Sequence, residues 1–341
     1  MNIKLFVYFF IIIGIWSCTS QSPEENCDIC GGNLIVEIPS KPNTLFPPAI
    51  EDEVSANIVH QFHMGLVRYN PSNLTINPGI ARTWDVDNTG KKYVFYLDST
   101  AVFHDSPCFS FGKGRGITAY DVQYTLRYLA TPQKHNENFA IVSRIKGAKE
   151  YYLNYEENPT AEIPGITIIN DYTIQLELET PASIFLYNLA RPAASIIPYE
   201  GVDEYGADML VGAGPFVCQN VSFDNTISLK KNQRFFKTDN QERQLPYLDS
   251  VTFLHVQHEE QTVHLFVQHK LDALLYVSSD IVPSIVDSLE KSGMKDYVLY
   301  TSTQSSHDNQ HYMYNVVSKN IRNLYTNDLH LLDAMNVYKQ N

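Results

Sequence analysis

Hydrophobic positions along the chain recur with two different periods, and this pattern predicts strands and helices in alternation. Short runs rich in β-branched residues, or alternating apolar and polar residues bounded by turn residues, indicate strands. These segments are Asn33–Ile38, Tyr93–Leu97, Ile166–Ile169, Tyr172–Leu178 and Val251–Val256. The third and fourth segments flank Asn170-Asp171, a turn dipeptide, and therefore predict a β-hairpin.

Apolar residues spaced by four positions indicate helices with one buried face. The first helix shows this spacing at Val54, Ile58 and Phe62, with Leu66 continuing the same face. A second helix begins at Thr118, whose hydroxyl can accept from a first-turn amide, while Asp121 favours the positive helix end. A third is expected from about Glu259 to Lys270. Because strands and helices are intermixed, the sequence predicts a mixed fold of the α/β or α+β class.

The N-terminus has the organisation of an export signal. One lysine, Lys4, precedes the apolar run Leu5–Ser17, which is shorter than the roughly 20 residues needed to cross a bilayer. Residues 1–17 are therefore expected to be a signal peptide. Ile15-Trp16-Ser17-Cys18 resembles a bacterial lipobox, in which the cysteine is acylated. We expect lipid at Cys18 to hold the exported protein on the bilayer, with residues 18–32 as a linker; the alternative is plain secretion.

Length and charge restrict the possible partners. Removal of residues 1–17 from the 341 leaves 324 (341 − 17), which is enough for two lobes. The removed part contains one lysine and no acid, so the formal charge changes from −13 to −14. A chain this acidic is repelled by phosphate backbones, so we expect no nucleic-acid partner.

The cysteines permit several kinds of chemistry. Four remain after Cys18, and outside the cytoplasm they can form disulfides: Cys27, Cys30, Cys108 and Cys218. The Cys27-x-x-Cys30 pair is consistent with a local disulfide, half of a metal site or a redox pair. His60 and His63 would complete a four-ligand set by count, but they lie in what looks like an amphipathic helix. We therefore expect no metal and no cofactor.

The sequence lacks the motifs of common catalytic sites. It contains no Gly-x-Ser-x-Gly elbow, no phosphate loop ending in Gly-Lys-Ser/Thr and no His-Glu-x-x-His. His104-Asp105 could be a base with its orienting acid, but no nucleophile accompanies it, so a structural role is expected for this histidine. The prediction is a binding protein and not an enzyme.

Several segments, each weak alone, occur in an informative order. They are residues 33–70, Asn77–Val86, Asn88–Leu97, Phe103–Asp105, Ile117–Val122, Gly212–Phe216, Leu229–Phe236 and Leu248–Phe253. In this order they resemble the extracellular solute-binding proteins of the oligopeptide and dipeptide importer family (family 5), over about residues 31 to 317. The resemblance implies a periplasmic-binding-protein-like type II fold of the peptide-binding subclass.

The resemblance also implies a division into three parts. Domain I is expected to combine residues 31–68 with 191–270, and domain II to be a satellite lobe at 69–190. Residues 271–320 match only the beginning of domain III, the lobe that closes over the ligand, and 321–341 resemble the family's last segment returning to domain I. The sequence therefore predicts a truncated closing lobe.

The resemblance points to ligand-facing residues on the first lobe. Glu51, Asp52 and Glu53 follow the proline-rich stretch and could meet a cationic amino terminus. Alternatively, these acids favour the N-terminus of the following helix. Phe139 and Tyr312 are aromatic candidates, with core packing as the alternative.

Together these features predict a lipid-anchored component of an ABC importer. It would capture peptides or similar small solutes outside the cytoplasm and deliver them to a membrane permease. A ligand held between two lobes loses water on both faces, and its buried polar contacts then count for more. A truncated closing lobe would leave one face of the ligand exposed, which weakens the hypothesis of solute capture. The alternative is a degenerate or truncated surface lipoprotein that keeps the scaffold for partner contact without capturing solute.

Overall fold

A computed structural model describes residues 30–70, 75–222, 226–257, 259–295, 297–305 and 310–318 of the chain. The predicted signal peptide, Cys18, Cys27 and the tail 321–341 lie outside these ranges. Within the described residues, no helix is both long enough and apolar enough to cross a bilayer.

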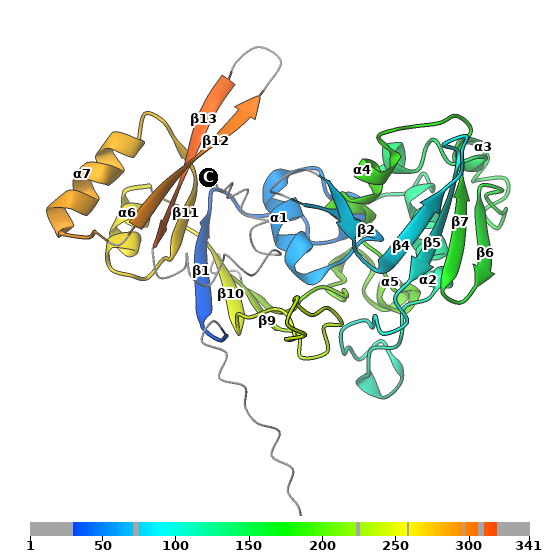
Figure 1. Cartoon of the computed structure of the whole chain (residues 1–341), viewed down its shortest axis with the longest axis horizontal. Helices are drawn as coiled ribbons and strands as arrows, with labels where there is room; N and C mark the ends of the chain where they lie inside the picture. The colour runs from blue at the N-terminus through cyan, green and yellow to red at the C-terminus, as the bar shows by residue number, and fades with distance from the viewer. Residues whose placement is uncertain are drawn as a thin grey trace, which may run out of the picture.

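The first strand lies at the centre of a seven-stranded sheet, near one end of the molecule (Figure 1). The strand order is β12-β13-β11-β1-β10-β9-β8. The bounds are β1 Asn33–Ile38, β8 Phe216–Ser222, β9 Thr226–Lys231, β10 Ser250–His255, β11 Ala273–Ser278, β12 Tyr297–Ser305 and β13 Gln310–Ser318. β1 pairs in parallel with β10 and β11, whereas the other neighbouring strands pair antiparallel.

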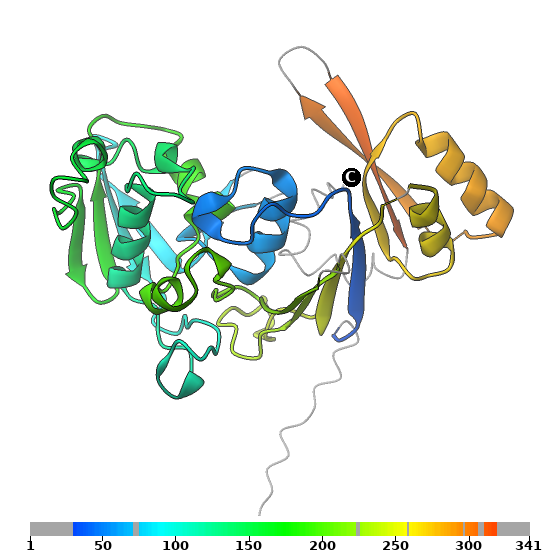
Figure 2. The ribbon, with the colours of Figure 1, turned by 180° about the vertical axis from the view of Figure 1, so that it is seen from behind.

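Both faces of this sheet are covered, which explains why β1 is almost continuously apolar. Leu34 and Val36 belong to the main hydrophobic core, which extends through α1 (Glu53–Phe62) into the rest of the chain. Ile35 points to a second cluster, which α6 (Glu259–Val267) and α7 (Val282–Ser292) form with β11. Figures 1 and 2 show α1 on one side of the sheet and α6 and α7 on the other.

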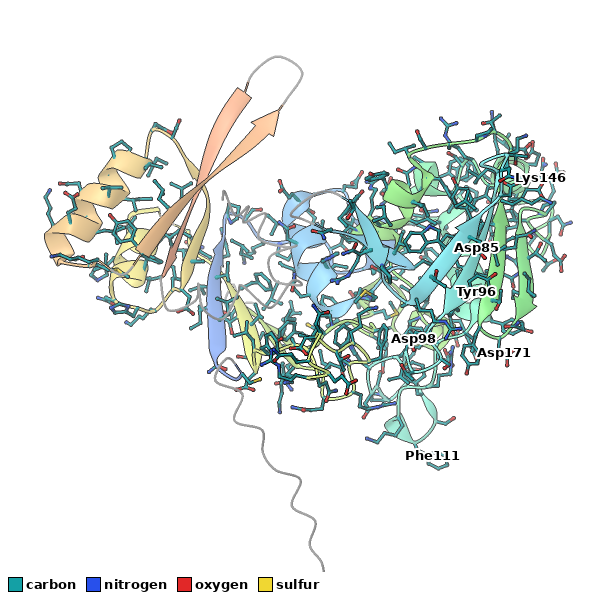
Figure 3. The ribbon with its side chains drawn as sticks, in the orientation of Figure 1. Asp85, Tyr96, Asp98, Phe111, Lys146 and Asp171 are labelled. Atoms are coloured by element: carbon teal, nitrogen blue, oxygen red, sulfur yellow. The ribbon has the colours of Figure 1, made fainter. Side chains whose placement is uncertain are left out.

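A second, four-stranded antiparallel sheet forms the opposite lobe. Its order is β4-β5-β7-β6, with bounds Ala81–Val86, Lys92–Leu97, Thr173–Glu177 and Ile166–Asn170 in that order. On its outer face the Tyr96 hydroxyl donates to Asp85 Oδ2 at 2.9 Å (Figure 3). On its inner face Phe95 and Ile174 are fully buried. This alternation is the pattern of a sheet that faces water on one side.

The remaining elements surround and connect the two sheets. The short helices are α2 Ala119–Leu129, α3 Ala148–Leu153, α4 Phe185–Leu189 and α5 Tyr199–Tyr205. The 3-10 helices are η1 Pro47–Ala49, η2 Ser110–Gly112, η3 Phe139–Ile141, η4 Pro192–Ala194 and η5 Gly206–Asp208. A two-stranded sheet, β2 (Val67–Tyr69) with β3 (Ile76–Pro78), lies between the lobes.

The strand and helix predictions are confirmed in kind, with two differences in extent. The five predicted strands, the hairpin at Asn170 and the capping box of Thr118 with Asp121 are all present. The first helix, however, ends at Phe62 and does not continue to Leu66. The third ends at Val267 instead of Lys270, because His269 adopts a positive φ.

The first helix ends early because a distant part of the chain donates the hydrogen bond to the carbonyl oxygen of its last residue, Phe62. The backbone N–H of Gly214 donates to the Phe62 oxygen at 3.0 Å, where a longer helix would have used Leu66. A Cβ atom on Gly212 would lie 1.9 Å from that same oxygen. Glycine at 212 is therefore a steric requirement of the contact between α1 and the segment before β8.

We expect Gly212→Ala to lower the free energy of unfolding by about 3 kcal/mol or more, because the backbones must separate to accommodate the methyl group. Urea denaturation followed by circular dichroism measures this loss. Gly116→Ala is the matched control, since nothing lies within 4 Å of a Cβ at that position. Equal stability of the two variants would contradict the steric argument.

Candidate functional site

The three predicted acids follow η1 directly, but they occupy different environments. Glu51 and Glu53 are exposed. Asp52 is the N-cap of α1, and its carboxylate accepts from the Ser55 backbone N–H at 2.8 Å and from the Ser55 hydroxyl at 2.6 Å. The helix-capping alternative therefore describes Asp52, because both oxygens are used in stabilising the first turn. Glu51 is the acid of the three that lines a cavity.

Phe139 is brought close to this loop by its neighbour Asn138. The buried Asn138 amide donates to the carbonyl oxygens of Pro48 at 3.1 Å and Ile50 at 2.8 Å. The Phe139 ring is half-buried and packs on Tyr152, with 4.2 Å between ring centroids. The Asn138 side chain therefore links the segment before η3 to the loop after η1 by two hydrogen bonds.

Tyr312 lies on β13, opposite Thr303 of β12. Its side chain is outside the described part of the structure. Its predicted role as a ligand contact therefore stays a prediction, as does lipid attachment at Cys18.

The cavity beside Glu51 has a volume of about 630 Å³, which lies in the range of small-ligand sites. Three carboxylates line it: Glu51 from the loop after η1, Glu137 from the segment before η3, and Asp208 at the end of η5. Leu45 and Leu210 add apolar surface, and no lysine or arginine is among its described lining residues. The cavity is therefore suited to a cationic group attached to an apolar body.

Of the predicted ligand-facing residues, Glu51 lines this cavity, whereas Phe139 is not among its described lining residues. The sequence analysis did not identify Glu137 or Asp208 as neighbours of Glu51. Glu137 and Asp208 lie in irregular segments without a periodic pattern, and only the fold brings them to Glu51. Asn138 is an isolated polar residue beside Phe139, and its buried position could not be recognised without the contact to Pro48.

The predicted structural role of His104 is supported by its contacts. It is buried, and its Nδ1 accepts from the Gly212 N–H at 3.4 Å, while Nε2 contacts the Gly214 carbonyl oxygen at 3.0 Å. One neutral tautomer, with the proton on Nε2, satisfies both contacts. Asp105 instead forms ion pairs with Lys113, at 2.8 Å, and with Arg234.

A second buried histidine lies nearby. Burial, with a smaller contribution from the neighbouring His104, lowers the pKa of His63 to about 3. Burial likewise lowers the pKa of His104 to about 4, against the opposing effect of its contact with the Gly214 carbonyl. Both rings are therefore neutral in the folded protein at neutral pH.

One of the four candidate metal ligands, Cys30, is not available as a thiolate. Cys30 is disulfide-bonded, so its sulfur is not the thiolate that a metal ion requires, whereas Cys108 and Cys218 are free. His63 is buried in the core beside Phe62, with 4.6 Å between ring centroids. Over the residues that the structure describes, no group of three or more metal-ligating side chains is placed to hold an ion.

We expect the two histidines to make stability fall as the pH is lowered from about 6.5 towards 3. Their pKa values are lower in the folded than in the unfolded chain, so the unfolded state takes up protons first. At pH 5 the loss should be on the order of 2 kcal/mol for each histidine relative to pH 7. Urea denaturation at pH 7, 6 and 5 measures it.

His63→Leu should reduce this pH dependence, because a leucine side chain takes up no proton. An apolar side chain also suits the site, since neither ring nitrogen of His63 has a described hydrogen-bond partner. His135→Gln is the control, since His135 is exposed. A variant that retained the full pH dependence would rule out His63 as its source.

The family follows from comparison of the whole chain. Residues 75–336 match the model of the bacterial extracellular solute-binding proteins, family 5 (middle region). Because this match covers most of the chain, the protein belongs to that family. This is the family that the sequence resemblance indicated.

Individual relatives are distant. The dipeptide-binding protein DppE of Bacillus subtilis is 24% identical over 260 residues, which is 74% of this chain and 44% of that protein. The di/tripeptide-binding protein 4 of Pseudomonas aeruginosa is 26% identical over 228 residues, covering 64% of this chain and 38% of the relative. The chain therefore spans less than half the length of these relatives.

Solved structures confirm the predicted fold class. A periplasmic oligopeptide-binding protein of Borrelia burgdorferi (OppAIV) aligns with a TM-score of 0.65 and 25% identity, over 80% of this chain and 52% of the other. The Helicobacter pylori protein DppA, in complex with the peptide STSA, gives a TM-score of 0.65 at 22% identity and covers 80% of this chain and 51% of its own. The fold is that of the peptide-binding periplasmic proteins.

Proposed function

We propose that this protein is the substrate-binding component of an ABC importer for peptides or similar small solutes. It captures its ligand outside the cytoplasm and delivers it to a membrane permease. The acidic cavity beside Glu51 is the main support, because a peptide combines a cationic amino terminus with an apolar body. Membership of the family, and the names of relatives that bind dipeptides and tripeptides, agree with this proposal.

In this proposal Glu51 binds the amino terminus, with Glu137 and Asp208 adding negative charge around the same cavity. Asp52 and Glu53 act on the first turn of α1, at the loop that carries Glu51. Phe139 forms the aromatic side of the site, and Tyr312 belongs to the part contributed by residues 271–320. The three-domain division, with domain II at 69–190, is included in the proposal.

The protein is also proposed to be tethered to the membrane by lipid at Cys18 and to face the periplasm or the cell surface. A tether keeps the binding protein near the permease that accepts its ligand, which raises its effective concentration there. The linker at residues 18–32 gives it the reach to do so.

Calorimetric titration of the protein lacking residues 1–17 with mixed di- to pentapeptides should give saturable heat. Glu51→Gln should weaken binding by about tenfold, because one of the three charges facing the cationic group is lost. Glu162→Gln is the control: it changes the formal charge equally at an exposed position that does not line the cavity.

A flat trace for the folded protein at about 1 mM peptide, a concentration that detects even weak affinity, would overturn the proposal. That result would favour the alternative of a scaffold without solute capture.

Cys18→Ala should move the protein from the membrane fraction to the soluble fraction of cells that express the full chain, because a single acylation site would carry the attachment. Immunoblotting of the two fractions measures the change. Cys108→Ala should leave the protein in the membrane fraction, since Cys108 is a free cysteine of the folded domain. Retention of the Cys18→Ala protein in the membrane would contradict lipid attachment at this residue.

A further inference from the structure

A second cavity, of about 490 Å³, lies on the solvent-facing side of α2. Six tyrosines line this tyrosine groove: Tyr120, Tyr124, Tyr128, Tyr151, Tyr155 and Tyr199. None of its lining residues lines the acidic cavity beside Glu51. The proposed function therefore makes no use of this groove.

The sequence of α2 explains why so many phenol rings gather here. Residues 120, 124 and 128 are four apart, so their side chains follow one face of the helix. Val122, Leu126 and Leu129 are fully buried on the opposite face. The tyrosine row therefore borders the core, with Tyr124 and Tyr128 partly buried against it and Tyr120 exposed.

The rings form the walls of the groove and do not lie in one plane. Tyr124 lies 6.4 Å from Tyr128 and 6.3 Å from Tyr199, measured between ring centroids, and the Tyr124 and Tyr199 planes meet at 67°. Across the groove, Tyr151 and Tyr155 lie 5.8 Å apart at 72°. Such edge-to-face packing leaves at least one face of each ring uncovered by its partner ring.

A partly buried ion-pair network fixes the wall that carries Tyr199. Arg115 donates to Asp121 of α2 at 2.7 Å and to Glu200 of α5 at 2.6 Å. Its guanidinium group also lies 5.5 Å from the centroid of the Tyr199 ring. The two helices that contribute Tyr124 and Tyr199 are therefore held together before any ligand arrives.

The polar groups of the groove fall into two sets. The Arg127 guanidinium is already occupied: it donates to the Pro159 carbonyl oxygen at 3.3 Å and lies 5.5 Å from the Tyr151 ring centroid. Tyr151 donates to the same carbonyl at 3.1 Å. The hydroxyl groups of the other five tyrosines have no hydrogen-bond partner among the described residues.

The hydroxyl groups of Tyr124 and Tyr128 remain protonated at physiological pH. Burial, with smaller contributions from neighbouring Tyr128 and Asp203, raises the pKa of Tyr124 to about 12. Burial also raises the pKa of Tyr128. Each phenol can therefore both donate and accept a hydrogen bond.

We infer that the tyrosine groove binds a neutral carbohydrate. A pyranose ring presents C–H groups that pack on aromatic faces, together with hydroxyl groups that donate and accept hydrogen bonds, and the groove offers the complement of both. The amides of Gln123 and Gln133 line it too, and also carry a donor and an acceptor. With no carboxylate among the described lining residues, and with Arg127 already paired, the groove favours an uncharged ligand.

A proline-rich peptide is the main competing ligand, since such peptides also dock on grooves lined by aromatic residues. Its backbone presents carbonyl acceptors but no N–H donor at each proline. The glutamine oxygens and the accepting lone pairs of the phenols would then stay unmatched. The balance of donors and acceptors therefore favours a sugar.

Calorimetric titration of the protein lacking residues 1–17 with maltotriose, cellotriose and chitotriose tests the inference. At least one of them should give saturable heat at up to about 10 mM, the range of weak sugar affinities. Tyr199→Ala should weaken that binding by about tenfold through the loss of a stacking face, and Tyr124→Phe by a smaller factor through the loss of a hydroxyl group.

Two control variants show whether a change in sugar binding comes from the groove, from the loss of any tyrosine, or from the acidic cavity. Tyr172→Ala removes a partly exposed tyrosine outside the groove and should leave sugar binding unchanged. Glu51→Gln should also leave it unchanged, so that failure of peptide binding and failure of sugar binding are distinguishable. The inference is overturned by no saturable heat with any of the three sugars, by binding that Tyr199→Ala does not weaken, or by binding of hexaproline alone.

Discussion

The contact of the Gly212–Gly214 backbone with the end of α1 is the constraint on which the two lobes depend. Gly214 donates to the Phe62 oxygen, while its own carbonyl oxygen contacts both the His104 ring and the Asn232 amide at 3.0 Å. Phe62, His104 and Asn232, which lie in three different segments, therefore meet at the tripeptide Gly212–Gly214. No side chain larger than hydrogen fits at Gly212, so the packing there is fixed by the backbone itself.

This junction also determines the chemistry of the histidines. Its polar contacts require His104 to be neutral, because the Gly212 N–H occupies Nδ1. His63, one residue after the helix end, is buried in the same place. The ring nitrogens of His104 are therefore already occupied by backbone contacts, whereas the carboxylates that line the acidic cavity lie in other loops.

The sequence analysis predicted the elements that depend on neighbouring residues. It was wrong where contacts between distant residues determine the end of an element. The strand Asn33–Ile38 and the capping box at Thr118 depend on neighbouring residues, and both are present. The end of α1 was missed because Gly214, about 150 residues later, replaces a helical hydrogen bond. Glu51 was found through the family resemblance, whereas Glu137 and Asp208 join it only through the fold.

The central position of β1 has a consequence for how this protein is made. Asn33 and Ser250 lie side by side although 217 residues separate them, and β11 follows later still. β1 must therefore wait for its partners until β10 and β11 have been synthesised. Such late closure slows folding, because the pairing of β1 joins residues far apart in the sequence. For a member of an extracellular family, a slow start to folding is compatible with transport.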